Sequence, residues 1–217
     1  MPQIIEPPRA LTHATLAHGA RALARGDPDL ATLFRRHGIP PMWARRPGFG
    51  TLIHIVLEQQ VSIAAARTLF RRLSHHLGEM TPRAVAAQGA ARLRRFGLTR
   101  QKASYCHDLA LAVQNGRLDL GRVARAADAD GRETLLAMRG LGPWSVDVYY
   151  LMALRRPDVW PCGDLALAIA LRDVKRLPGK PGNAEQQAIS ASWAPWRSVA
   201  ARLLWHHYLS TPRSQRN

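Results

Sequence analysis

The sequence predicts an all-α protein, and three observations support this fold class. Apolar residues recur at intervals of three and four positions through most of the chain, as on the buried face of a helix. Residues that begin helices (Ser, Thr, Asp, Pro) and end them (Gly) divide these segments at short intervals. No segment shows the alternation typical of strands, and no internal repeat is visible. With 47% hydrophobic residues among 217, the chain can bury a sizeable core.

The N-terminal half is expected to contain short helices separated by proline and glycine. Residues 1–10 are proline-rich and are expected to form a strap or a loose tail. Threonine before proline marks a helix start, and glycine after an apolar run marks a helix end. The expected segments are Leu11–Arg25, Asp29–His37, two helices within Thr51–Leu77 interrupted near Gln60–Ser62, a helix that starts at Thr81–Pro82, a short helix that ends over Leu93–Gly97, and Thr99–Asn115.

The C-terminal half is expected to continue as helices. Two of them form the arms of a glycine-rich hairpin, and Pro195 breaks the last segment in two. The expected segments are Leu120–Ala127, Gly131–Met138, Trp144–Leu154, Asp164 to about Leu177, and Ala184–Tyr208.

The stretch Met138–Asp164 carries the candidate chemistry. Gly140 and Gly142 permit a tight turn with positive φ and expose backbone amides, and Pro143 suits the first position of the following helix. The turn is therefore a candidate phosphate site, although an ordinary interhelical turn has the same composition. Asp164 begins another apolar helix, where amides and the helix dipole favour a negative charge. Asp147 is expected to be a surface acid in a first helical turn.

Charge indicates the class of partner. Thirty-one Lys and Arg against fifteen Asp and Glu give a net charge of +16, which favours nucleic acid over a neutral metabolite; arginine-rich codon usage or solubility is the alternative. Arginines such as Arg71, Arg72, Arg94 and Arg95 are expected to form a solvated basic surface. The two cysteines fit no disulfide framework, and the sequence shows no signal peptide or membrane span, so we expect a cytoplasmic protein associated with the nucleoid.

The segment from Glu133 to Leu171 resembles the signature of the helix-hairpin-helix DNA glycosylase superfamily. In that signature a Gly/Pro-rich loop, here Pro161–Gly163, is followed by a fixed aspartate, here Asp164. Three further segments resemble the alkylated-base branch, 3-methyladenine DNA glycosylase II. They read LIHIVLEQQVS, RFGLTRQKASYCHDLA and WAPWRSVAARLLWHHY, and the resemblance covers roughly residues 27–209.

The resemblance implies a two-lobed fold with the active-site cleft between the lobes. Residues 1–45 and 161–217 would form one lobe. Residues 46–160 would form a central helical barrel that carries the helix-hairpin-helix. The small β-rich N-terminal domain of the longer relatives has no expected counterpart here.

The resemblance also implies roles for individual residues. Asp164 would be catalytic, stabilising positive charge on the sugar and orienting or deprotonating water; otherwise it is a helix cap. Trp144 and Trp205 would line the base pocket, or be core residues. Gln60 would be the wedge that fills the gap in the duplex, or bond backbone at the helix break. Phosphate binding would fall to the hairpin residues Arg139, Gly140, Leu141 and Gly142.

Departures from the family pattern narrow the expected chemistry. Bifunctional members carry a lysine where this chain has Trp144, so a monofunctional enzyme that uses water is expected. Two cysteines cannot hold the four-cysteine iron–sulfur cluster of other members. The pocket tyrosine of the family falls on Val148. We expect no cofactor and no catalytic metal, although in this family a monovalent cation often bridges the hairpin carbonyls.

The expected function is hydrolytic excision of alkylated purines, of the 3-methyladenine and 7-methylguanine type, from damaged double-stranded DNA. The protein would act as a monomer and leave an abasic site. Two alternatives stay open: a non-catalytic helix-hairpin-helix DNA-binding module, and a glycosylase for deaminated bases such as uracil or hypoxanthine.

Overall fold

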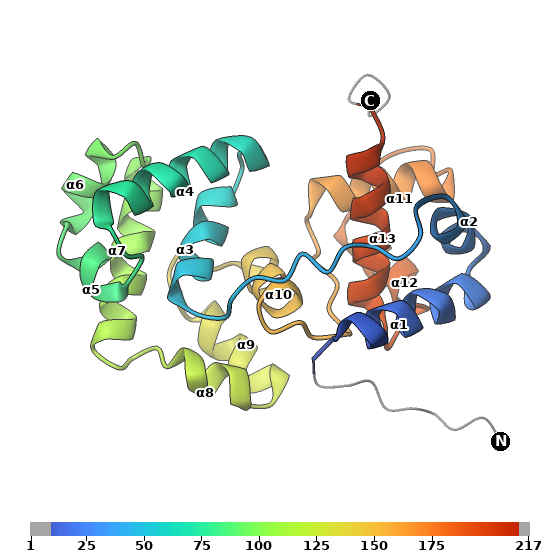
Figure 1. Ribbon diagram of the computed structural model, residues 1–217, viewed down its shortest axis with the longest axis horizontal. Helices are drawn as coiled ribbons and strands as arrows, with labels where there is room; N and C mark the ends of the chain where they lie inside the picture. Colours follow the sequence, from blue (N-terminus) through green and yellow to red (C-terminus); the bar gives the residue numbers. More distant parts are fainter. Residues whose placement is uncertain (1–9, 213–217) are drawn as a thin grey trace. The chain divides into compact units, whose positions relative to one another are not determined.

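The computed structural model describes residues 10–212, and every regular element within them is a helix (Figure 1). The expected all-α class is therefore confirmed. Residues 1–9, expected to be a strap or tail, lie outside the described residues. None of the described helices is both long and apolar enough to cross a membrane. The helices are α1 (His13–Gly26), α2 (Pro28–His37), α3 (Phe49–Glu58), α4 (Ile63–Leu77), α5 (Pro82–Ala86), α6 (Gly89–Arg95), α7 (Arg100–Gln114), α8 (Leu120–Arg125), α9 (Asp128–Leu136), α10 (Pro143–Met152), α11 (Leu165–Lys175), α12 (Asn183–Ala191) and α13 (Arg197–Ser210).

The chain divides into two compact units, which we call unit 1 (residues 1–44 and 150–217) and unit 2 (residues 45–149). The first boundary falls one residue before the expected position. The second falls inside α10 rather than after residue 160, so the expected boundary is corrected by eleven residues. The physical reason is that residues 150–160 are bonded into unit 1. Leu11 N donates to Arg155 O (2.7 Å), and Val159 N donates to Ser198 Oγ (2.9 Å).

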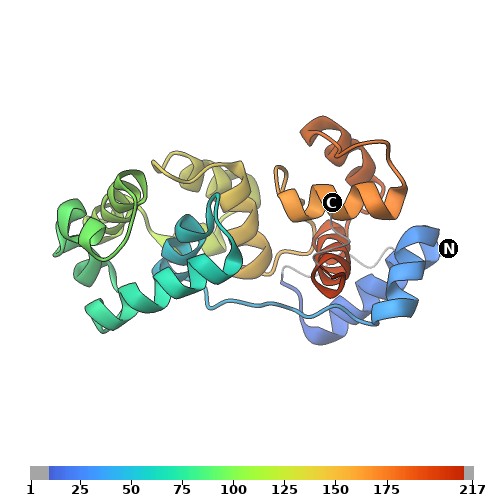
Figure 2. The ribbon, with the colours of Figure 1, turned by 90° about the horizontal axis from the view of Figure 1, so that it is seen from above.

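Unit 1 is built around α13, whose residues are buried on all sides from Ser198 to Trp205. A helix that is buried all round belongs in the centre of a core. Figure 2 shows α13 nearly end on, with α11 on one side and α1 and α2 on the other, and α12 also contacts it.

A fully buried arginine lies in this core. Arg202 donates to the carbonyl oxygens of Met42 (2.9 Å), Ser198 (3.0 Å) and Leu151 (2.7 Å). Burial lowers the pKa of its guanidinium to about 9, which still leaves it protonated at neutral pH. A guanidinium has a planar fork of donors, so one side chain can satisfy acceptors on three separate segments.

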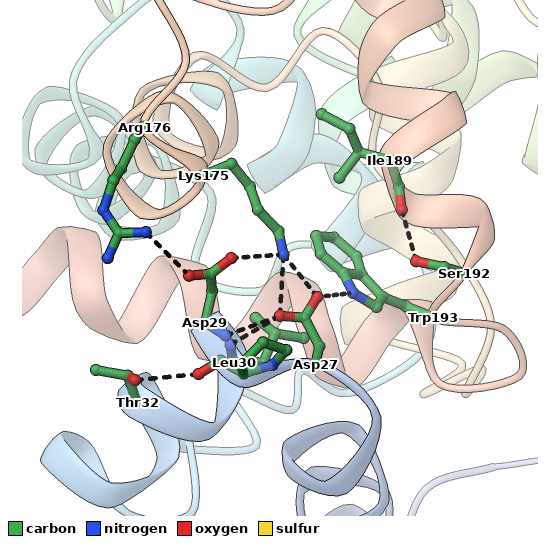
Figure 3. Close-up of polar contacts among 10 residues, drawn as sticks. Asp27, Asp29, Leu30, Thr32, Lys175, Arg176, Ile189, Ser192 and Trp193 are labelled. Carbon is green, nitrogen blue, oxygen red and sulfur yellow. Dashed lines mark hydrogen bonds and ion pairs between the residues drawn. The ribbon is translucent and has the colours of Figure 1, made fainter.

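A polar cluster around Asp27 joins both ends of unit 1 (Figure 3). Asp27 caps α2 by accepting from the amides of Asp29 and Leu30. Lys175 Nζ, at the end of α11, donates to both Asp27 oxygens (2.9 and 2.8 Å) and to Asp29 (2.9 Å). Trp193 Nε1 donates to Asp27 Oδ2 (2.8 Å). Segments almost 170 positions apart in the sequence therefore meet on one carboxylate.

Unit 2 contains α3 to α9 and most of α10. The apolar α3 is buried along most of its length, and its C-terminal carbonyl at Leu57 accepts from Lys102 Nζ of α7 (2.8 Å). The expected interruption near Gln60–Ser62 is confirmed, because α3 ends at Glu58 and α4 begins at Ile63. Tyr149 on α10 is buried, and its hydroxyl accepts from the amide of Gly48 just before α3 (3.1 Å). These contacts fix both ends of α3 inside the unit.

Candidate functional site

The hairpin between α9 and α10, residues 139–142, is held tightly by its own unit. Gly140 adopts φ +91°, and a Cβ added there would lie 2.7 Å from Tyr105 Cβ on α7. Leu141 is only 4% exposed, and its amide donates to Met138 O (3.1 Å). Gly140 is thus required both by backbone conformation and by close packing. The hairpin is a fixed feature of the surface of unit 2.

Gly142 differs from Gly140, and the expectation of positive φ at this second glycine is wrong. Positive φ in this hairpin is confined to Gly140. Pro143 begins α10, and a residue before proline favours extended backbone, which any residue can adopt. A Cβ added at Gly142 would meet no heavy atom within 4 Å. The space beside this backbone is therefore open, so a ligand can approach the start of α10 closely.

Arg139, expected to neighbour a phosphate, makes contacts with α7. Its Nη1 donates to Ser104 Oγ and Asp108 Oδ2 (both 3.0 Å), and its guanidinium carbon lies 5.5 Å from the centre of the Tyr105 ring. The side chain remains 67% exposed. The structure thus shows an arginine that braces the hairpin while keeping much of its surface in solvent.

The two glutamines at the end of α3 have different surroundings. Gln59 Nε2 donates to Gly140 O (2.8 Å) and to Ser145 Oγ (2.9 Å), which ties α3 to the hairpin. Gln60 is exposed and adopts φ +56°, an unusual conformation for a residue other than glycine. Sequence reasoning selected Gln60 and gave Gln59 no part in the hairpin. No local pattern identifies a contact made across 81 positions.

Asp147 is not the surface acid that its place in α10 suggested. It is 4% exposed and forms an ion pair with Arg132 of α9. Because α10 is buried on most of its circumference, a charged side chain there needs a partner inside the protein. The ion pair joins the two arms of the hairpin.

Asp164 lies at the N-cap of α11 in unit 1, directly after Gly163, which adopts φ +82°. Its Oδ1 accepts from the amide of Leu167 (3.0 Å) and from Trp205 Nε1 of α13 (3.1 Å). The residue is half-buried. A cap and an indole donor on one oxygen restrict the rotation of the carboxylate, so its orientation is set before any ligand binds.

Trp205 is also packed against a second tryptophan. It is 7% exposed, and its ring meets the Trp43 ring edge to face at 6.4 Å. Trp43 has φ +45° and also meets the His206 ring at 6.3 Å. Sequence reasoning missed Trp43, which lies in a Pro-rich loop with no helical pattern to mark it. The structure thus brings together two of the predicted site residues, Asp164 and Trp205.

Trp144 stands in the first turn of α10 and is half-buried. It belongs to unit 2 with the hairpin, whereas Asp164 and Trp205 belong to unit 1. Val148, one turn further along α10, is buried at 2% exposure, and the hydroxyl of neighbouring Tyr149 is bonded to Gly48. Among the aromatic side chains of α10, Trp144 is therefore the one that keeps an accessible surface, since Tyr149 and Tyr150 are buried.

The site geometry is suited to two tasks. An anionic carboxylate whose position is fixed in advance can stabilise a positive charge that develops on a bound molecule. The hairpin and the start of α10 offer backbone amides and a helix dipole to a phosphate. The carboxylate belongs to unit 1, and the hairpin belongs to unit 2.

Residues 53–197 match a family model described as HhH-GPD superfamily base excision DNA repair protein. A putative DNA-3-methyladenine glycosylase of Bacillus subtilis, YfjP, is 28% identical over 82% of this chain, which spans 64% of that relative's length. DNA-3-methyladenine glycosylase 1 of Schizosaccharomyces pombe is 28% identical, with 74% of this chain and 72% of the relative covered. The solved structure of S. pombe 3-methyladenine DNA glycosylase (Mag1) in complex with abasic DNA is similar, with 26% identity and a TM-score of 0.80. The match covers 87% of this chain and 95% of that one.

Proposed function

Because the chain belongs to the HhH-GPD superfamily of base excision DNA repair proteins, we propose that it excises alkylated purines from duplex DNA. It hydrolyses the N-glycosidic bond and leaves an abasic site. The observation that carries this proposal is the fixed carboxylate of Asp164, held by the Leu167 amide and the Trp205 indole. A DNA-binding module without activity has no need of such a group.

Asp164 supplies the charge that the reaction requires. As the bond between base and sugar breaks, positive charge develops on the deoxyribose, and a nearby carboxylate stabilises it. The Leu167 amide and the Trp205 indole hold Asp164 Oδ1 in place for this interaction. The same group can orient or deprotonate the attacking water. The carboxylate therefore acts as an electrostatic stabiliser and not as an acid.

Base recognition requires that the nucleotide leave the duplex, at a cost of a few kcal/mol. We assign the gap-filling wedge to Gln60, which is exposed at the break after α3. We assign contact with the extruded base to Trp144 and Trp205. Alkylated purines are cationic, and an electron-rich ring favours a cation over a neutral base. Their glycosidic bond is also weakened, so a modest catalyst can discriminate.

Water is the nucleophile in this proposal, because the lysines lie elsewhere. A strand-cleaving mechanism needs an amine to attack the sugar, and Trp144 stands where related enzymes carry it. Of the three lysines in the sequence, Lys102 donates to Leu57 O and Lys175 is bound by Asp27 and Asp29. Lys180 lies in the loop before α12. The expected product is an intact strand with an abasic site.

The reaction needs no cofactor. The hairpin carbonyls are oxygen ligands of the kind that a monovalent cation takes, but Gly140 O already accepts from Gln59 Nε2. We therefore assign no step to a cation. The partner is double-stranded DNA with damaged bases, and the protein acts as a monomer at the nucleoid.

The test is base release from a methylated duplex. Purified protein should release 3-methyladenine and 7-methylguanine faster than a protein-free control, measured by chromatography of the free bases. The strand should stay intact until alkali cleaves it at the abasic site. No release above the control from methylated, hypoxanthine-containing or uracil-containing duplexes would leave DNA binding as the function.

A further inference from the structure

Unit 2 contains a second hairpin with the backbone pattern of the first. It joins α6 to α7 and reads Phe96–Gly97–Leu98–Thr99, which we call the α6–α7 hairpin. Gly97 has φ +103°, and Leu98 is 5% exposed. Gly140 has φ +91° and Leu141 is 4% exposed at the corresponding places between α9 and α10. The sequence showed no internal repeat, because two residues are too short a pattern to detect.

Arginines surround the α6–α7 hairpin. A surface hollow of about 440 Å³ opens beside it. A Cβ added at Gly97 would lie 3.0 Å from Arg72 Nη1, so a further guanidinium reaches the hairpin from α4. The hollow is lined by Ala91, Arg94, Arg95, Leu98, Thr99 and Arg100.

This region is strongly cationic. Between Gln59 and His107 the sequence has nine Lys and Arg against Glu79 alone, so this segment contributes +8 to the net charge of +16. Within residues 10–212, no carboxylate forms an ion pair with Arg94, Arg95 or Arg100. Exposed guanidinium groups without acidic partners are available to an external anion, and a charge of this density favours a polyanion.

The α6–α7 hairpin is also held in place before any ligand binds. The Phe96 ring stacks on the His76 ring of α4 at 4.4 Å, nearly parallel. The guanidinium carbon of Arg92 lies over the Phe96 ring, 5.9 Å from its centre. Thr99 Oγ1 caps α7 by accepting from Lys102 N (3.2 Å). A site whose backbone is already ordered loses less entropy when it binds.

We propose that the α6–α7 hairpin is a second backbone-binding site for duplex DNA, in which Arg94, Arg95 and Arg100 contact phosphates. This rests on the DNA-directed function proposed above and replaces the expectation that Arg94 and Arg95 form only a solvated surface. Both hairpins lie against α7. Tyr105, which packs on Gly140, is six residues beyond Thr99, about 9 Å along the helix axis. One unit thus presents two phosphate-binding turns.

The experiment measures how DNA affinity depends on salt. Arg94→Gln/Arg95→Gln is compared with the matched control Arg21→Gln/Arg25→Gln, which removes two charges from the exposed face of α1 in unit 1. The probe is an undamaged fluorescent duplex of about two helical turns, roughly 20 base pairs. Each lost phosphate contact should reduce the slope of the logarithm of the binding constant against the logarithm of salt concentration by about 0.9. The slope for Arg94→Gln/Arg95→Gln should therefore be smaller by roughly one to two units.

The outcomes separate cleanly. An unchanged slope, or an equal loss in the control, would overturn the second site and leave net charge as the explanation. Arg94→Lys/Arg95→Lys keeps both charges and should retain the slope, which guards against a folding defect. Base release is assayed in parallel on methylated duplex. Absence of release in the unmodified protein would contradict the proposed function, whereas a normal release rate with an unchanged slope would contradict only the α6–α7 site.

Discussion

Asp27 and Asp164 occupy the same kind of position in unit 1, yet their surroundings differ. Each is the N-cap of a helix, α2 or α11, and each accepts a hydrogen bond from an indole N–H. At Asp27 the indole comes from Trp193, and Lys175 bonds both oxygens. At Asp164 the indole comes from Trp205, and the same oxygen accepts from the amide of Leu167.

The difference shows how one local design serves two purposes. The ammonium of Lys175 compensates the charge of Asp27 and joins the end of α11 to the start of α2, so that carboxylate holds the fold together. At Asp164 the Leu167 amide and the Trp205 indole hold one carboxylate oxygen in place, and a carboxylate of fixed position is what a stabiliser of positive charge requires. The contrast can be tested by changing each residue in the same way.

Asp164→Asn should have the largest effect, and on catalysis alone. Asparagine is as good an N-cap as aspartate, but it lacks the negative charge that the transition state needs. Base release from methylated duplex should fall by about 100- to 1,000-fold, while the free energy of unfolding changes by less than about 0.5 kcal/mol. Single-turnover release and denaturant unfolding measure the two quantities. A variant that keeps full activity would remove Asp164 from the mechanism.

Asp27→Asn should show the reverse pattern. The change removes the main partner of Lys175, although Asp29 remains beside it. The side chains of Lys175 and Asp27 are only 21% and 12% exposed. Partial exposure screens the pair, so we expect a loss of about 1–3 kcal/mol in unfolding free energy, below that of a fully buried pair. The release rate per folded molecule should stay within about twofold of the unmodified protein. A large loss of activity in folded protein would show that Asp27 has more than a structural role.

The two tryptophans offer a smaller version of the same test. Trp205→Phe removes the indole donor from Asp164, and Trp193→Phe removes it from Asp27. Each loses one hydrogen bond to a charged group, worth about 1.5 kcal/mol. The first loss should appear mainly in the release rate, as about a tenfold decrease, and the second in thermal stability. Equal effects of both changes on stability alone would argue against a positioning role for Trp205.

The smallest expected effect is on acid stability. Burial by itself raises the pKa of Asp27, but hydrogen bonds from Lys175, Trp193 and the Leu30 amide outweigh it and hold the pKa below its ordinary value. Such a group stabilises the folded state above the ordinary pKa of about 3.9, and this contribution is lost as pH falls through the lower folded value. The stability difference between the unmodified protein and Asp27→Asn should therefore narrow below about pH 4. Urea unfolding at pH 3 and pH 6 measures it, and a constant difference would contradict the assignment.

Most of the helices could be predicted because their signals are local. Thr99 before α7, Thr81 and Pro82 at α5, and Gly116 after α7 act within one turn of the chain, and the structure places helix ends beside each of them. The position of Asp164 as a helix cap follows from the same kind of signal.

Contacts between distant segments could not be predicted in this way. The ion pair that buries Asp147 depends on Arg132 in the opposite arm of the hairpin. The role of Gln59 depends on where Gly140 O lies, and the support of Trp205 depends on Trp43 in a loop. The second unit boundary fell inside an uninterrupted helix, where composition does not change. In each case the deciding partner is set by tertiary packing, which leaves no periodic pattern in the sequence.

The buried guanidinium of Arg202 has a consequence for the order in which the chain folds. Met42 and Leu151, two of its three acceptors, lie just before and just after the continuous segment that forms unit 2. During synthesis unit 2 emerges whole and can fold as soon as it leaves the ribosome, because domains fold as units. Unit 1 cannot be completed until α13 is made. Arg202 then donates hydrogen bonds to Met42 and Leu151, which lie on either side of unit 2 in the sequence. A helix that follows unit 2 in the sequence thus completes a unit whose first segment precedes unit 2.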